Sequence, residues 1–352
     1  MAISKHALPS SAPRQFGSGF RARVTRSAPV SSSSASTRKP PKDFLSILDF
    51  DPEQIDEALR LAARMKQERR LGRRASTANA LAALHVALIF DKPSLRTRAT
   101  FEIAVRELGG DVIVPPTDVT GGSRETPADV ARNLERWVAA AVIRTFAQER
   151  LEAFAEAAPK LHVINALSDE EHPCQGMADL LTLTELWNDV RGRTLAFIGD
   201  GNNVATSLVH AAMLSGMHMR IASPEGFDLP AHVVADAARV ARHGATLTLV
   251  RDPKEAVENA AAVYTDVWTS MGQEAEKDSR NQVFLPYQVN GELMAKATGD
   301  AVFMHCLPAH RGDEVTDEVI DAPYSVVFDQ AENRLHIQKA LLMMLVGSPA
   351  AR

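Results

Sequence analysis

The chain has 352 residues, of which 45% are hydrophobic, and a formal net charge of −5 at pH 7. This length suits two globular domains, and the acidic balance gives no reason to expect a nucleic acid or an anionic membrane as a partner. The apolar runs are much shorter than the roughly 20 residues of a membrane-spanning helix, and two distant cysteines exclude a disulfide framework and favour a reducing compartment.

The first 42 residues differ in composition from the rest of the chain. They contain eight Lys or Arg, no Asp or Glu, and the run SSSSAS. Such a segment cannot bury enough apolar surface to fold, so we predict a disordered basic leader over residues 1–42. Acid-poor leaders rich in Arg and Ser are also typical of organelle transit peptides. A transit peptide, a disordered tail and a wrongly assigned start remain alternatives, so we predict a cytoplasmic protein, or one of an organelle matrix if the leader is a transit peptide.

From residue 43 onward, short apolar runs alternate with amphipathic stretches, several of which begin at a capping residue such as Asp51 or Thr126. Helices are predicted over residues 52–68, 95–108, 126–138, 149–158, 177–187, 204–216, 230–244, 253–260 and 331–347. Strands are predicted over residues 85–90, 140–144, 161–167, 194–199, 218–223, 246–250 and 262–266, and the apolar runs 301–307 and 324–328 continue the series.

Repeated strand–helix alternation predicts an α/β fold with parallel sheets covered by helices. The alternation pauses at residues 188–193, where we place a domain boundary. We therefore expect two domains, residues 43–187 and 188–328, each a mainly parallel sheet flanked by helices. Interdomain helices join them, and residues 329–352 form a C-terminal helix that returns to the first domain. Ligands of such folds bind beyond the carboxyl ends of the strands.

The stretch FDKPSLRTR, residues 90–98, follows a predicted strand and opens a predicted helix. A helix N-terminus presents free N–H groups and favours anions. Ser94 and Thr97 add hydroxyl donors, and Arg96 adds a guanidinium fork suited to oxyanions. This spacing favours a phosphate site that is not a Walker A loop. The alternative is a solvated arginine beside a capping serine.

Two further stretches carry groups that suit a small polar substrate. In EHPCQ, the His172 imidazole can donate to a carbonyl oxygen and the Gln175 amide can accept from an NH2 group, although a structural histidine is the alternative. In TDVWTSMGQE, Asp266 ends a strand and can hold an ammonium group, with a glycine-containing loop following it. By itself, this second stretch does not distinguish a substrate loop from a surface loop.

Cys306 in MHCLPAHRG also follows a strand end, where a thiol can act as a nucleophile, a metal ligand or a hydrogen-bonding group. Two cysteines and scattered histidines make a metal site unexpected, while a cysteine hydrolase stays open. The stretch GDGNN, residues 199–203, hints at a dinucleotide fold, but Val204 breaks the G-x-G-x-x-G fingerprint. We predict no metal and no cofactor.

Four of these stretches, in the order SLRTR, HPCQ, DVWTSMG and HCLP, resemble the motifs of the aspartate and ornithine carbamoyltransferase family. The resemblance covers residues 43–352 and implies that residues 43–187 bind carbamoyl phosphate and residues 188–328 bind ornithine. DVWTSMG and HCLP resemble the members that use ornithine, because members that use aspartate carry basic residues and H-P-L-P at these places.

The resemblance also implies roles for individual residues. It assigns carbamoyl phosphate binding to Ser94, Leu95, Arg96, Thr97, Arg144, His172, Gln175, Cys306, Leu307 and Arg334. It assigns ornithine binding to Asn203, Asp266, Ser270 and Met271. It names Cys306, Asp266, Arg144 and His172 as catalytic, with no covalent intermediate on the cysteine.

The activity that the resemblance implies is transfer of the carbamoyl group from carbamoyl phosphate to the Nδ amine of L-ornithine, giving L-citrulline and phosphate. Such a step belongs to arginine biosynthesis or to a urea-cycle type of pathway, and its direction in the cell stays open. Alternatives are another acceptor, such as putrescine or an N-acylated ornithine, and an inactive binding protein.

The resemblance implies a homotrimer, or a multiple of trimers, with active sites shared across subunits. One position departs from the family pattern. Thr120 stands where members carry a Gln or His that reaches the neighbouring subunit's carbamoyl phosphate. A threonine hydroxyl reaches less far, so this inter-subunit contact is open.

Overall fold

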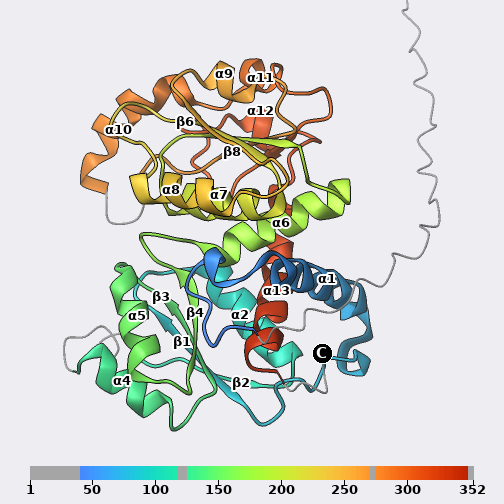
Figure 1. The fold of residues 1–352 in the computed structure, drawn as a ribbon, viewed down its shortest axis with the longest axis vertical. Helices are drawn as coiled ribbons and strands as arrows, with labels where there is room; N and C mark the ends of the chain where they lie inside the picture. The colour runs from blue at the N-terminus through green and yellow to red at the C-terminus, as the bar shows by residue number, and fades with distance from the viewer. Residues whose placement is uncertain (1–39, 117–124, 270–273, 348–352) are drawn as a thin grey trace, which may run out of the picture. The chain divides into compact units, whose positions relative to one another are not determined.

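The computed structural model describes residues 40–116, 125–269 and 274–347, which form two parallel sheets covered by helices (Figure 1). The first sheet has the order β2-β1-β3-β4, and all three pairings are parallel. Its strands are β1 (His85–Phe90), β2 (Asp111–Ile113), β3 (Ala140–Arg144) and β4 (His162–Leu167). The predicted α/β class is confirmed.

The second sheet has the order β7-β6-β5-β8-β9, again with parallel pairings only. Its strands are β5 (Thr194–Ile198), β6 (His218–Ala222), β7 (Leu247–Val250), β8 (Ala262–Thr265) and β9 (Val302–Met304). The chain leaves β5 toward β6 and leaves the adjacent strand β8 in the opposite direction, toward β9, so the switch point lies between β5 and β8. A topological switch point of this kind opens a crevice at the carboxyl ends of the strands.

Helices and short 3-10 helices surround the first sheet, and several of them begin at a side-chain cap. Asp51 and Gln54 form a capping box at the start of α1, and the Thr126 side chain accepts a hydrogen bond from the Asp129 N–H at the start of α4. The elements are η1 (Ile47–Asp49), α1 (Pro52–Glu68), η2 (Arg69–Arg74), α2 (Leu95–Glu107), α4 (Pro127–Leu134) and α5 (Gln148–Ala157).

The helices of the second sheet are mostly shorter. Asn202 caps α7 by accepting from two backbone N–H groups, and Gly216 ends this helix in the left-handed region. The elements are α7 (Asn203–Ser215), α8 (Ala231–Val240), α9 (Pro253–Val257), η3 (Glu274–Glu276), α10 (Lys277–Phe284), η4 (Leu285–Tyr287), α11 (Gly291–Met294) and α12 (Asp317–Ile320).

Two long helices, α6 (Pro173–Trp187) and α13 (Val327–Leu345), are buried along most of their length. α13 packs against α1, α2 and α6, and α6 packs against α7 (Figure 1). One hydrophobic cluster therefore runs without interruption from α1 and α2 through α6 and α13 to α7 and β5. A helix that is buried on nearly all sides needs neighbours on all of them.

The apolar run 324–328 does not continue the series of strands. Ser325 makes an isolated bridge with Phe303, and the chain becomes helical from Val327. The last helix thus begins four residues before the predicted start at residue 331.

Lys42, the last residue of the predicted leader, contacts the end of α5. Its Nζ donates to the carbonyl oxygens of Ala155, Ala158 and Leu161 at 2.8, 3.1 and 3.1 Å. An ammonium group is well suited to the unpaired carbonyls at a helix C-terminus. No helix among the described residues is both long and apolar enough to span a membrane.

Candidate active site

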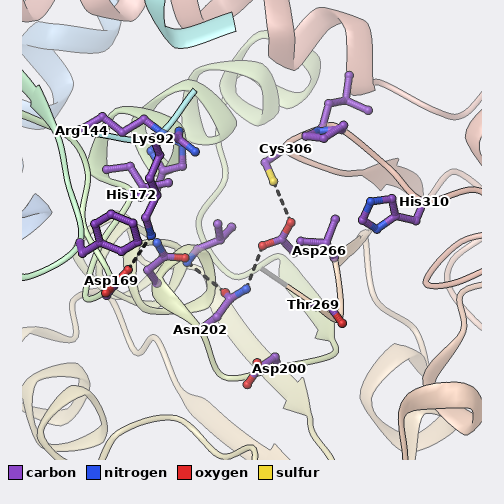
Figure 2. A pocket seen from close by; sticks show the side chains of 17 residues that line it. Lys92, Arg144, Asp169, His172, Asp200, Asn202, Asp266, Thr269, Cys306 and His310 are labelled. Carbon is purple, nitrogen blue, oxygen red and sulfur yellow. Dashed lines mark hydrogen bonds and ion pairs between the residues drawn. The ribbon is translucent and has the colours of Figure 1, made fainter. Parts of the chain in front are cut away.

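A cavity of about 550 Å³ lies where strands of both sheets end (Figure 2). Arg144 ends β3 and Leu167 ends β4, while Asp266 follows β8 and Cys306 follows β9. The walls of the cavity are formed by Lys92, Arg144, Phe146, Leu167, Asp169, His172, Asp200, Asn202, Asn203, Val204, Asp266, Val267, Thr269, Cys306, Leu307, Pro308 and His310. The predicted position beyond the carboxyl ends of the strands is thus occupied by a cavity.

The guanidinium groups of Arg96, Arg144 and Arg334 lie close together on the side of the first sheet. Arg334 reaches from α13, donating from Nη1 to Gln175 Oε1 at 2.5 Å and from Nη2 to Thr97 Oγ1 at 3.1 Å. Burial, followed by the nearby charge of Arg334, lowers the pKa of Arg144 to about 10, and burial lowers those of Arg96 and Arg334. The Nε atoms of Arg144 and Arg334 are buried and have no partner among the described residues. This arrangement suits an anion.

His172 stands at the N-cap of α6 and is buried. Burial, with the charges of Arg334 and Arg144, holds its pKa well below the usual value, so the imidazole is neutral at physiological pH. Its Nδ1 has no partner among the described residues. A neutral imidazole beside an anion site can donate one hydrogen bond without adding another positive charge.

A buried hydrogen-bond network lies behind Gln175. The Oδ1 atom of Asp179 accepts from Gln175 Nε2 at 2.7 Å and from Gln330 Nε2 at 2.8 Å, and its Oδ2 accepts from the Tyr264 hydroxyl at 3.1 Å. Because Gln175 donates to Asp179 and accepts from Arg334, its amide orientation is fixed. The network joins α6, α13 and β8.

On the side of the second sheet, Asp266 is the centre of a short chain of hydrogen bonds (Figure 2). Its Oδ2 accepts from Asn202 Nδ2 at 2.8 Å, and its Oδ1 accepts from Cys306 Sγ at 3.0 Å. Burial, with the charge of Asp266, raises the pKa of Cys306 well above its usual value. A thiol that stays protonated is a poor nucleophile, which argues against a cysteine hydrolase.

Asp266, His305 and Cys306 each offer one potential metal-ligand atom, and these atoms lie within 4.8 Å of one another. Both ring nitrogens of His305 already have partners, because Nε2 lies 3.2 Å from Glu314 Oε1 and Nδ1 accepts from Leu307 N–H at 2.9 Å. The thiol and the carboxylate are hydrogen-bonded to each other. These existing bonds do not fit the donor set of a metal centre.

The other predicted site residues differ in whether they line the cavity. Ser94 is the N-cap of α2 but makes no side-chain capping bond, and the Leu95 side chain is 80% exposed. Asn203 lines the cavity, although its Nδ2 donates to Ser168 O at 2.6 Å. Ser270, Met271 and Thr120 lie outside the described residues.

Sequence reasoning missed several cavity residues. Asn202 holds Asp266, and the Lys92 ammonium pairs with Asp169 at 2.9 Å and lies 3.9 Å from the centre of the Phe146 ring. Their positions after strand ends were the available signal, but the sequence does not show which neighbour in a loop turns toward a substrate.

Arg144 from the first sheet and the hydrogen-bonded pair Asp266 and Cys306 from the second line one cavity of a two-sheet α/β protein. Two family models match the chain. The carbamoyl-P binding domain of aspartate/ornithine carbamoyltransferase matches residues 42–185, and the Asp/Orn binding domain matches residues 191–345. The chain belongs to the aspartate/ornithine carbamoyltransferase family.

Relatives and solved structures agree with this assignment. The chain is 48% identical over 307 residues to the ornithine carbamoyltransferase of Anoxybacillus flavithermus, covering 87% of this chain and 96% of that one. It is 51% identical over 314 residues to that of Rhodococcus opacus, with the same coverage. The ornithine carbamoyltransferase structure from Pyrococcus furiosus aligns with a TM-score of 0.81 at 43% identity, covering 87% of this chain and 97% of that one.

Proposed function

We propose that the chain transfers the carbamoyl group of carbamoyl phosphate to the Nδ amine of L-ornithine, giving L-citrulline and phosphate. The observation that carries this proposal is a cavity lined by Arg144 and a neutral His172 on one side and by Asp266 and Cys306 on the other, with Arg96 and Arg334 close to Arg144. An anionic donor and a cationic acceptor would each meet the opposite charge there.

The donor side would act by electrostatics. Arg96 and the N-terminus of α2 would hold the phosphate, together with Ser94, Leu95 and Thr97. Arg144 and His172 would stabilise the carbonyl oxygen as it gains negative charge, and Gln175 and Arg334 would orient the NH2 group and the phosphate. Removing one such donor typically costs roughly 2.7–4 kcal/mol in the transition state.

The acceptor side would hold and orient ornithine. Asp266 and Asn203, with Ser270 and Met271 from the neighbouring segment, would bind its charged groups, and Cys306 and Leu307 would lie against the reacting centre. A side-chain ammonium has a pKa of ~10.4, so the reaction requires the neutral Nδ amine. That amine would bond to the carbonyl carbon, the carbon–oxygen bond to phosphate would break, and the proton released by Nδ would leave with the phosphate.

The test is citrulline formation by purified protein from carbamoyl phosphate, with ornithine, putrescine, N-acetylornithine and aspartate compared at equal concentration. We expect turnover with ornithine only. Turnover with another amine alone would refute the acceptor assignment, and no turnover with any of them would refute the activity.

A matched pair of variants on α2 tests the donor side. We expect Arg96→Gln to raise the KM for carbamoyl phosphate at least tenfold, because a half-buried fork is lost. Arg106→Gln, on the exposed last turn of the same helix, should leave it within twofold. Equal KM values for the two variants would contradict the phosphate role of Arg96.

We also propose a homotrimer, or a multiple of trimers, that works in the cytoplasm in arginine biosynthesis. Membership of this family supports the assembly. The two free cysteines support a reducing compartment. Light scattering should give about three times the chain mass of 38.2 kDa, or a multiple of that value, and a monomer would refute the assembly.

A further inference from the structure

Glu171 is a buried carboxylate, 5% exposed, that immediately precedes His172 and has no part in the proposed chemistry. Four donors surround it. Ser46 Oγ lies 2.5 Å from Oε1, Ser207 Oγ lies 2.8 Å from Oε2, and His210 Nδ1 lies 3.1 Å from Oε1. The backbone N–H of Ile47 donates to Oε2 at 3.4 Å. The carboxylate thus ties η1 and α7 to the turn that enters α6.

The same face of α7 holds this turn at two further points. Asn203, Ser207 and His210 are spaced i, i+4 and i+7, which places them on one side of the helix. The Asn203 amide donates to Ser168 O, and Ser207 Oγ accepts from the backbone N–H of His172 at 3.0 Å. Ser207 thus bonds both to the Glu171 side chain and to the His172 backbone.

A close approach of two helices makes this contact possible. Gly176 lies one turn into α6, and a Cβ placed there would be 3.1 Å from Ser207 O and 3.2 Å from Ser207 Cβ. A side chain at residue 176 would therefore push α7 away from α6. The missing side chain at Gly176 lets the Ser207 hydroxyl accept from the backbone N–H of His172.

We propose that Glu171 is a positioning residue, which acts through Ser207 and His210 of α7 to fix the place of His172 beside the carbamoyl donor. The proposal rests on the function given above, because it takes the His172 imidazole as a group that contacts carbamoyl phosphate. Glu171 itself is not among the residues that line the cavity.

The physical argument is that the reaction rate depends on how precisely the His172 imidazole is placed. The imidazole of His172 makes no side-chain hydrogen bond through Nδ1 among the described residues, so the backbone at residue 172 sets its place. A displacement of about 1 Å at a reacting group can lower the rate up to about 100-fold. The hydrogen bonds of Glu171 and Ser207 hold this backbone against a helix of the second sheet.

The experiment compares Ser207→Ala and Glu171→Gln with the parent enzyme and with a control, Asp43→Asn. Asp43 is another largely hydrogen-bonded carboxylate, 15% exposed, but it lies in the N-terminal segment, where it accepts from Val163 N–H and pairs with Lys42 rather than binding the His172 turn. We measure kcat, the Kd for carbamoyl phosphate without ornithine, and Tm, working well below each variant's Tm.

For Ser207→Ala we expect a kcat at least tenfold lower and a Kd at least threefold higher, and for Glu171→Gln at least a threefold change in kcat in the same direction. Asp43→Asn should lower Tm with kcat and Kd within twofold of the parent. If Glu171→Gln keeps kcat and Kd within twofold, whatever its Tm and whatever Ser207→Ala does, the hydrogen bonds of Glu171 are only structural and the proposal is overturned. If Glu171→Gln does not fold, Ser207→Ala decides alone.

The two proposals fail in different ways. A parent enzyme that binds carbamoyl phosphate but makes no citrulline would refute the activity, while the Kd values of the variants would still decide the positioning role. A parent that neither binds carbamoyl phosphate nor makes citrulline would overturn both.

Discussion

Asp179 is a buried acid that makes stability depend on pH. Burial raises its pKa to about 6 from an ordinary value near 3.8, although three side chains donate to it. The folded state therefore holds a proton that the unfolded state has lost between pH 4 and pH 6. This group stabilises the fold at low pH, and its contribution is lost as the pH rises through that window.

Asp179→Asn removes this dependence while it keeps an oxygen for the two glutamines. We expect the unfolding free energy of the parent to fall by about 2 kcal/mol relative to the variant between pH 4 and pH 7. Urea unfolding at four pH values measures the difference. A difference that stays constant with pH would contradict the raised pKa.

At the scale of residues, the sequence identified groups whose chemistry is distinctive. His172, Cys306 and Asp266 could be singled out because each follows a strand end and carries an unusual side chain, and all three line the cavity. Asn202 and Glu171 could not, because their importance lies in which side chains they meet across the chain. Such pairings depend on how the helices pack, which a local pattern does not encode.

At the scale of elements, the loop between β5 and α7 shows why a glycine stands in GDGNN. A Cβ at Gly201 would lie 2.4 Å from Leu229 N and 2.5 Å from Asp228 C, so the loop packs directly on backbone. The adjacent Asn202 both caps α7 and holds Asp266. This glycine therefore serves close packing, and the dinucleotide fingerprint is not needed to explain it.

Gly201→Ala should displace the loop and, with it, the partner of Asp266. We expect the KM for ornithine to rise at least tenfold with a smaller change in the Kd for carbamoyl phosphate, as steady-state kinetics and calorimetric titration would measure. Gly299→Ala is the control, since a Cβ there meets nothing within 4 Å. An ornithine KM equal to that of the control would refute the packing role.

Elements with their own capping signals were predicted well, and the run 324–328 was not. α1 begins at Pro52, as the Asp51 cap predicts. Residues 324–328 have the aromatic and β-branched composition of a strand, but they pair only through one bridge at Ser325 before α13 begins. Tertiary packing around α13 overrides the local preference there.

At the scale of the whole molecule, α6 and α13 make the two sheets share a core. One cluster of buried apolar side chains includes members from both. We expect differential scanning calorimetry of the purified protein to give a single unfolding transition. If one sheet unfolded together with its helices, it would expose the apolar side chains that pack against the other sheet's helices. Two separated transitions would show that the domains unfold independently.

The position of Arg334 on the last helix has a consequence for synthesis. Thr97 and Gln175, which Arg334 contacts, leave the ribosome long before it does. A growing chain can form the first sheet early, but the contacts of Arg334 with Thr97 and Gln175 form only when translation is nearly over. Under the proposed assignment of Arg334 to carbamoyl phosphate, a chain that ends before α13 would lack part of the donor site.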